Sequence, residues 1–271
     1  MQNLKKKIFI FFLFVYLLIG SLNSINTGIS FDEYHEELNW KFHVNIFINI
    51  KNVITNKERF KKKEFNEEVK RFVGYGIGSQ IISQPIQFFL KDIIKKNKNI
   101  DDYGAKLLSK HFVIFLFFFT SGIFFYLILR KIIDSENFAI IGTGIYLLYP
   151  YLFGQAMFSP KDVPFMSVWL ICTYLSFNLF DNLIKNNEIK YNQLILFSII
   201  TSYLLSIRFA GILIFIQYAI LFFLFINLYK INFINFFKIF YLKLVFYLFF
   251  LILFIFIFNP IFFINSFLLI K

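Results

Sequence analysis

Long apolar runs, separated by short polar stretches, dominate the sequence and constrain its fold more than any other feature. Seven runs can be read, at about 8–25, 112–129, 138–153, 163–180, 191–207, 209–229 and 244–258. A helix of about 20 apolar residues spans a bilayer, and only helices and closed barrels satisfy the backbone there. Because the runs are continuous and not alternating, they predict an all-α polytopic membrane helix bundle with about seven transmembrane helices.

Composition agrees with this class. Of the 271 residues, 58% are hydrophobic and 16% are charged, whereas a soluble domain has about 25% charged residues. The net charge is +12, which in a membrane protein indicates contact with anionic lipid headgroups and a topology signal. The sequence holds no RNA- or DNA-binding motif, so we expect membrane lipids as partners and no nucleic acid.

The short loops predict the orientation. If the N-terminus is cytoplasmic, the inner side carries Lys5, Lys6, Lys7, Arg130, Lys131, Lys185, Lys190, Lys230, Lys238 and Lys243. The short loops of the other side carry only Lys161 and Arg208. This excess of inner cations predicts a cytoplasmic N-terminus, with Asp32, the long loop, Lys161, Asp162 and Arg208 on the outer side. We expect an integral, multi-pass protein of the cytoplasmic (inner) membrane. The chain would be a single membrane domain, 1–271, with residues 23–109 forming an outer loop within it.

The outer loop contains two segments of interest. Residues 38–50 alternate between apolar and mostly polar side chains, which is typical of a strand, although a helix stays open. Residues 86–96 follow helical spacing, with lysines opposite the apolar side chains. They predict an amphipathic helix on the membrane surface or, alternatively, one packed on a protein domain. We interpret Lys57–Lys63 as a solvated face and Tyr75–Ser79 as a glycine-rich linker.

An acidic stretch, residues 31–37, follows the first run. It contains Asp32, Glu33, Glu36 and Glu37, together with His35. Carboxylates are avoided inside a bilayer, so a cluster beside a membrane helix calls for a reason. We predict that Asp32 is a catalytic base, with Glu33 beside it. The alternative is a solvated acidic cap on a helix end.

Two further groups of ionisable residues fall on the predicted outer side. Lys161 and Asp162 occupy the turn between the third and fourth runs, and Arg208 lies in the shortest connection. Together with Asp32 they fit sugar transfer from a lipid phosphate. The phosphate leaves without protonation, whereas the acceptor hydroxyl needs a positioned base, whose pKa partial burial would raise toward the working range. Cations would stabilise the charge that grows on the departing phosphate.

The chain resembles the GT-C superfamily of polytopic glycosyltransferases, which includes protein O-mannosyltransferases and the aminoarabinose transferase of lipid A. The resemblance rests on Phe31-Asp32-Glu33, the long first outer loop, Lys161-Asp162-Val163-Pro164-Phe165, Arg208-Phe209-Ala210-Gly211 and Asn259-Pro260. It implies a catalytic Asp in the first outer loop, carried by Asp32, and a second acid carried by Asp162.

The resemblance also implies a polyprenyl-phosphate-linked sugar as donor and a glycan, lipid or protein as acceptor. It further implies juxtamembrane helices in the first loop, which favours a helix over 38–50. We therefore predict Asp32, Glu33 and Asp162 as catalytic residues, and His35, Lys161 and Arg208 as substrate-binding residues, on the outer face.

No cofactor is predicted, and no metal site, although Asp32, Glu33, His35 and Asp162 leave a divalent cation open. Two other classes compete with the transferase. One is a lipid or solute transporter, which would place polar groups at mid-membrane. The other is a non-catalytic membrane subunit, because family members usually have more spans. The short run 261–270 suggests that the sequence is a fragment of a longer protein.

Overall fold

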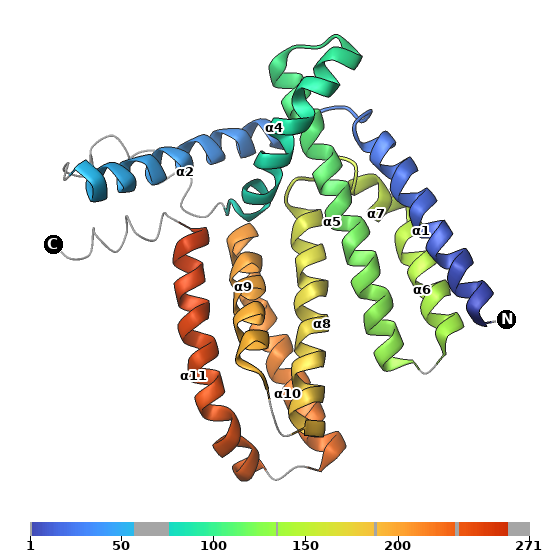
Figure 1. Ribbon diagram of the computed structural model, residues 1–271, viewed down its shortest axis with the longest axis vertical. Coiled ribbons are helices and arrows are strands. Elements are labelled where there is room, and N and C mark those ends of the chain that lie inside the picture. Colours follow the sequence, from blue (N-terminus) through green and yellow to red (C-terminus); the bar gives the residue numbers. More distant parts are fainter. Residues whose placement is uncertain (1, 57–75, 134, 187–188, 231–232, 260–271) are drawn as a thin grey trace. The chain divides into compact units, whose positions relative to one another are not determined.

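The computed structural model describes residues 2–56, 76–133, 135–186, 189–230 and 233–259. Within these ranges the chain is helical almost throughout and contains no strand, which confirms the all-α prediction (Figure 1). The helices are α1 (Gln2–Ser24), α2 (Phe31–Asn56), α4 (Gly78–Lys98), α5 (Asp102–Ile132), α6 (Glu136–Leu148), α7 (Pro150–Gln155), α8 (Asp162–Asn186), α9 (Tyr191–Ile207), the 3₁₀ helix η2 (Phe209–Leu213), α10 (Ile214–Tyr229) and α11 (Phe233–Phe258). The segments 57–63 and 261–270 lie outside the described residues.

Among the described residues, five stretches of helix are long and apolar enough to cross a membrane: Leu4–Ser24, Asp102–Ile132, Asp162–Leu183, Phe209–Tyr229 and Phe240–Phe258. The other two expected spans form shorter apolar helices, α6 and α9, of 13 and 17 residues. The expected run 138–153 is interrupted because Tyr149, before Pro150, is extended, as residues before proline tend to be. The structure thus supports a multi-pass helical membrane protein.

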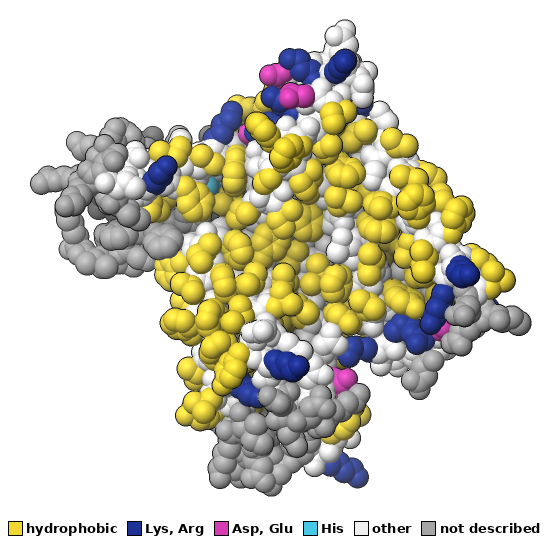
Figure 2. Space-filling view, viewed as in Figure 1, with side chains coloured by type: hydrophobic (Ala, Val, Ile, Leu, Met, Phe, Trp, Pro, Cys, Tyr) yellow, Lys and Arg dark blue, Asp and Glu magenta, His cyan; other side chains and the backbone are white. Residues whose placement is uncertain are grey.

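The helices belong to two compact units, each built from two stretches of chain. Unit 1 comprises Met1–Tyr34 and Ser79–Tyr174, and unit 2 comprises His35–Gly78 and Leu175–Lys271. On the face that Figure 2 shows, hydrophobic side chains cover the lengths of the helices, while Lys and Arg side chains gather near helix ends. This distribution is expected of helices whose flanks face hydrocarbon.

Unit 1 is built on α1, α5 and α6. The Lys5 ammonium donates to the Asn137 side chain over 3.0 Å, and further along the helices the Tyr16 hydroxyl donates to the Leu147 carbonyl over 2.7 Å. Helices α1 and α6 therefore run in the same direction. At the opposite end from Lys5, the His111 ring reaches the Ser24 carbonyl, so α5 runs antiparallel to α1.

The core of unit 1 joins α1, α5, α6 and the start of α8. Its fully or nearly buried members are Tyr16, Ile114, Phe115, Phe118, Leu147, Ala156, Met157 and Val163. Helix α1 comes very close to α5, because a Cβ built on Gly20 would lie 1.9 Å from the Phe115 ring. The beginning of α8, at Val163, thus packs beside Tyr16 in the second half of α1 and beside the middle of α5.

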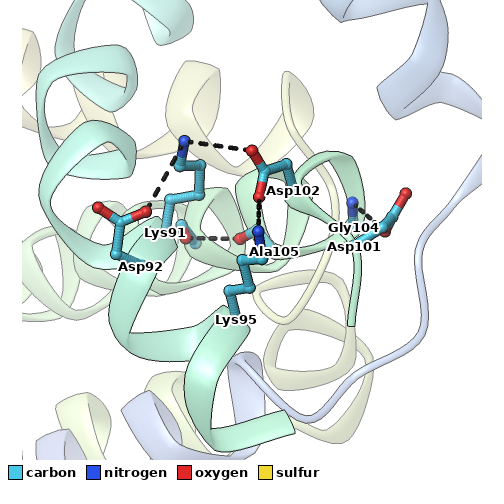
Figure 3. Close-up of polar contacts among 8 residues, drawn as sticks. Lys91, Asp92, Lys95, Asp101, Asp102, Gly104 and Ala105 are labelled. Atoms are coloured by element: carbon cyan, nitrogen blue, oxygen red, sulfur yellow. Dashed lines mark hydrogen bonds and ion pairs between the residues drawn. The ribbon is translucent and has the colours of Figure 1, made fainter. Parts of the chain in front are cut away.

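Helices α4 and α5 form a hairpin in unit 1 (Figure 3). Asn99 makes the turn with a φ of 50°, a left-handed conformation that asparagine tolerates. The Asp101 side chain caps α5 by accepting from the Gly104 N–H over 2.9 Å. Asp102 lies 3.8 Å from Lys91 and also accepts a hydrogen bond from Lys95. Exposed ion pairs therefore close this end of the hairpin.

The amphipathic segment expected at 86–96 lies within α4. Phe88 and Phe89 are each 74% exposed, and Ile93 is also exposed. The polar side chains of Ser83 and Gln87 are instead buried on the same helix. Ile94 is buried, and Leu90 packs with it against Ala105 and Leu108 of α5. The apolar residues of α4 are thus divided between an exposed surface and the packing against α5, and the membrane-surface interpretation stays a prediction.

Unit 2 packs α9, α10, α11 and the second half of α8 through aromatic side chains. The rings of Phe197 and Tyr247 stack at 5.2 Å between centroids, and Phe197 also contacts Tyr218 of α10. The Ser198 hydroxyl donates to the Tyr247 carbonyl over 3.1 Å, which ties α9 to α11. The Phe180 ring of α8 contacts Phe222 of α10.

The segment Gly76–Gly78, which is part of the predicted linker, leads into α4 and is packed within unit 2. A Cβ on Gly76 would lie 2.1 Å from the Ser206 carbonyl oxygen, so the glycine backbone lies directly against the end of α9. The Gly76 carbonyl accepts from Asn39 over 3.2 Å, and the Gly78 carbonyl accepts from Tyr203 over 2.8 Å. Ile77 between them is fully buried.

Candidate functional site in unit 1

The first turn of α2 positions the acidic stretch. The Ser30 N–H donates to Glu33 Oε1 over 2.7 Å, and the Glu33 N–H donates back to the Ser30 carbonyl. A glutamate that bonds back to the residue three positions earlier is half of a capping box. Helix α2 continues through 38–50, so the helical alternative holds there and the strand-like pattern is misleading.

Glu33 makes a buried pair with His111. Both side chains are fully buried, and His111 Nε2 lies 2.9 Å and 3.0 Å from the two carboxylate oxygens of Glu33. On the other side of the ring, Nδ1 lies 3.1 Å from the Ser24 carbonyl oxygen. Residues from the end of α1, the start of α2 and the first third of α5 therefore meet at one imidazole.

This geometry fixes where protons lie. A carbonyl oxygen can only accept, so His111 Nδ1 carries a proton and donates it to Ser24. If Nε2 were bare and Glu33 ionised, two acceptors would face each other in a buried site. One proton is therefore shared between Nε2 and the carboxylate, as His⁺ with Glu⁻ or as neutral His with protonated Glu.

Asp32 has a different environment, although it is the next residue in the chain. Its side chain is exposed, so the partial burial expected for a catalytic base is not found. The capping contact takes Glu33 into the buried position, and a helix turns its successive side chains about 100° apart. Glu36 and Glu37 are also buried, which is the opposite of a solvated acidic cap.

Lys161 and Asp162 lie at the start of α8. Asp162 is the first residue of the helix, where a negative charge is favourable, and its side chain is exposed. The Ser159 hydroxyl donates to Asp162 Oδ2 over 3.3 Å. Lys161 is half-buried, and its carbonyl accepts from the Phe165 N–H over 2.9 Å.

Asp32, Glu33, Lys161 and Asp162 lie at the same end of unit 1. Helix α1 ends there, and the start of α8 packs beside Tyr16 in the second half of α1. The four predicted residues of unit 1 are thus brought to one end, although no direct contact joins the Asp32 and Asp162 side chains in the described residues.

The other two predicted residues, His35 and Arg208, belong to unit 2. His35 is half-buried on α2. Arg208 follows α9 in an extended conformation, with its N–H bonded to the Leu204 carbonyl and its own carbonyl accepting from Gly211. Because Gly76–Gly78 packs against the last turn of α9, the backbone beside Arg208 is held in place.

The sequence interpretation missed His111 as a partner of the acidic stretch. The signals were present: Ser30 and Glu33 have capping-box spacing, and an ionisable residue directly before the apolar run 112–129 needs a partner. What the sequence lacked was the antiparallel packing of α1 and α5, which brings positions 33 and 111 together. Among the described residues, no group of three or more His, Cys, Asp or Glu could hold a metal ion.

Comparison with protein-family models, with curated proteins and with solved structures found no match. The similarity to GT-C glycosyltransferases therefore rests on the short sequence motifs alone and stays a prediction.

Proposed function

We propose that the chain is a GT-C-type membrane glycosyltransferase, which moves a sugar from a polyprenyl-phosphate-linked donor to an acceptor hydroxyl on the outer face of the inner membrane. The observation that carries the proposal is the contrast between Asp32 and Glu33. Glu33 is buried and bonded to His111, while Asp32 beside it is exposed at the end of unit 1 where α8 begins.

In this proposal Asp32 is the general base that takes the proton of the acceptor hydroxyl. An exposed carboxylate is ionised and accessible, and it is desolvated only when donor and acceptor cover it. Glu33 is then a positioning residue, because its bonds to Ser30 and His111 fix the helix turn that carries Asp32. This modifies the direct catalytic role that the sequence suggested for Glu33.

In this scheme Lys161, at the same end of unit 1 as Asp32, would neutralise the departing lipid phosphate. His35 and Arg208 belong to unit 2, and their role as substrate-binding residues stays a prediction from the sequence. Asp162, at the N-terminus of α8, would orient the acceptor or the sugar. The sugar and the acceptor are proposed only by class.

The test is a lipid and glycan profile of cells that carry the wild-type gene, no gene, or the Asp32→Asn variant. We expect Asp32→Asn to reduce transfer by about 100- to 10,000-fold, as loss of a general base does. The polyprenyl-linked sugar should accumulate while the protein stays in the membrane. Asp92→Asn, on the exposed carboxylate of α4, is the matched control and should transfer normally. Normal transfer by Asp32→Asn would overturn the proposal.

One observation favours a second candidate, a proton-coupled transporter. The Glu33–His111 pair is a buried ionisable pair in a membrane protein, and such pairs mark proton relays as well as structural sites. A transporter of this kind should lose coupling in Glu33→Gln and keep it in Asp32→Asn. A transferase should instead lose sugar transfer in Asp32→Asn and keep more of it in Glu33→Gln. The two variants together therefore discriminate between the candidates.

A further inference from the structure

Unit 2 contains an apolar cavity of about 340 Å³ between the second half of α8 and helices α9, α10 and α11. Leu194 and Phe197 of α9 and Phe222 of α10 form part of its wall. The volume lies within the range of about 300–1,000 Å³ typical of ligand sites. One polar group of its wall, the Tyr218 hydroxyl, lies 3.0 Å from the Thr201 hydroxyl.

The cavity opens onto the outer surface of the helices. Two lining residues, Phe223 of α10 and Leu248 of α11, are 56% and 41% exposed. Both lie within stretches that are long and apolar enough to cross a membrane, Phe209–Tyr229 and Phe240–Phe258. In a bilayer this opening therefore faces lipid, because such flanks are surrounded by hydrocarbon.

One charged residue, Lys243, lines this otherwise apolar cavity. It is half-buried in the first turn of the span Phe240–Phe258, and it makes no ion pair with any residue in the described ranges. The ring contact between Tyr191 and Phe246 places Lys190 at the same end of unit 2. A lysine at this depth keeps its stem in hydrocarbon and its ammonium at the headgroup level.

We propose that this cavity binds one acyl chain of an anionic phospholipid from the surrounding bilayer, with the lipid phosphate paired to Lys243. The apolar wall would surround the acyl chain, and the ammonium of Lys243 would pair with the negative headgroup. Basic pockets between membrane helices are known to bind acidic lipid headgroups on the cytoplasmic side. This site is separate from the proposed transfer chemistry and does not depend on it.

The test measures which lipids stay bound to the full-length protein. The protein is purified in detergent, mixed with equal amounts of phosphatidylglycerol and phosphatidylcholine, and analysed by native mass spectrometry. Wild type should retain phosphatidylglycerol about fivefold over phosphatidylcholine, the effect of one lysine at an anionic lipid surface. Lys243→Met, which keeps the stem and removes the charge, should bring the two lipids to equal retention.

Two further variants separate the cavity from general surface charge. Ala219 lines the cavity and is itself exposed, so Ala219→Trp should fill the space without disturbing the core and should reduce retention of both lipids. Lys190→Met removes a cation at the same end that does not line the cavity, and it should leave retention unchanged. If Lys243→Met preferred phosphatidylglycerol over phosphatidylcholine as strongly as wild type does, the proposal would be overturned. Displacement of phosphatidylglycerol by a polyprenyl phosphate would also overturn it, since that would make the cavity a donor site.

Discussion

The region between α1 and α5 is held at two places by different physical means. In unit 1, Glu33 is fixed by a buried side-chain pair with His111, which depends on a shared proton. In unit 2, Gly76 and Gly78 are fixed by shape and by backbone carbonyls that accept from Asn39 and Tyr203. The first anchor should respond to loss of a hydrogen-bonding partner, whereas the second should respond to a single added methyl group.

The largest effect is expected from Gly76→Ala in unit 2. The new Cβ would lie 2.1 Å from the Ser206 carbonyl oxygen, and a backbone atom cannot move aside as a side chain can. Added methyl groups in packed cores cost about 1–3 kcal/mol, and a clash with backbone should exceed that range. We expect little folded protein by size-exclusion chromatography.

Gly28→Ala is the matched control, because no atom lies within 4 Å of a Cβ built there. It should elute as wild type does. If Gly76→Ala also folded with an unchanged melting temperature, steric fit would not be what holds this segment.

The next effect is expected from Glu33→Ala in unit 1. Removing one partner of a buried ionisable pair costs about 3–5 kcal/mol, because the other partner stays buried without its bond. The melting temperature in detergent should fall accordingly. The Glu33→Gln side chain keeps the shape of glutamate, can donate to His111 Nε2 and can still accept from the Ser30 N–H. The melting temperature of this variant should therefore fall less than that of Glu33→Ala.

The ranking of these two variants sharpens the comparison between the anchors. Equal losses from Glu33→Ala and Glu33→Gln would mean that the carboxylate charge itself is required. Wild-type stability in Glu33→Ala would mean that the pair is not an anchor, and the positioning role proposed for it would fail.

The sequence predicted the helical class, because continuous apolar runs leave few alternatives in lipid. It also predicted that ionisable residues would gather after the first run. It did not predict which acid would be buried: Asp32 and Glu33 are adjacent and chemically alike, and their difference arises from the Ser30 cap and from His111, 78 residues away. Likewise, Gly76 in isolation is typical of a flexible turn, and its close contact with Ser206 depends on tertiary packing.

A smaller effect is expected at the end of the α4–α5 hairpin, where the contacts are exposed. Asp101→Ala removes the cap that accepts from the Gly104 N–H, and loss of an N-cap costs about 0.5–2 kcal/mol. A modest fall in melting temperature should result, and Asp101→Asn should restore most of it because asparagine also caps. A fall as large as that of Glu33→Ala would contradict the distinction between exposed and buried anchors.

The smallest effect is expected from Lys95→Gln, which breaks the exposed pair between Lys95 and Asp102 in the same hairpin. The hydrogen bond to Asp102, and then its negative charge, raise the pKa of Lys95 above its ordinary value of 10.5. A raised pKa means that the folded state favours the charged lysine. The pair therefore stabilises the fold below that ordinary value, and the contribution disappears as the pH rises through the higher folded-state pKa.

Because the pair lies in water, salt should screen most of its contribution. Thermal unfolding at pH 7 should show a slight deficit of Lys95→Gln relative to wild type at low salt, and that deficit should vanish in 1 M salt. The deficit of Glu33→Ala should persist in the same salt, because its partner is shielded from ions by burial. If both deficits vanished together, the Glu33–His111 pair would be accessible to ions, and the contrast between a buried anchor in unit 1 and its exposed ion pairs would not hold.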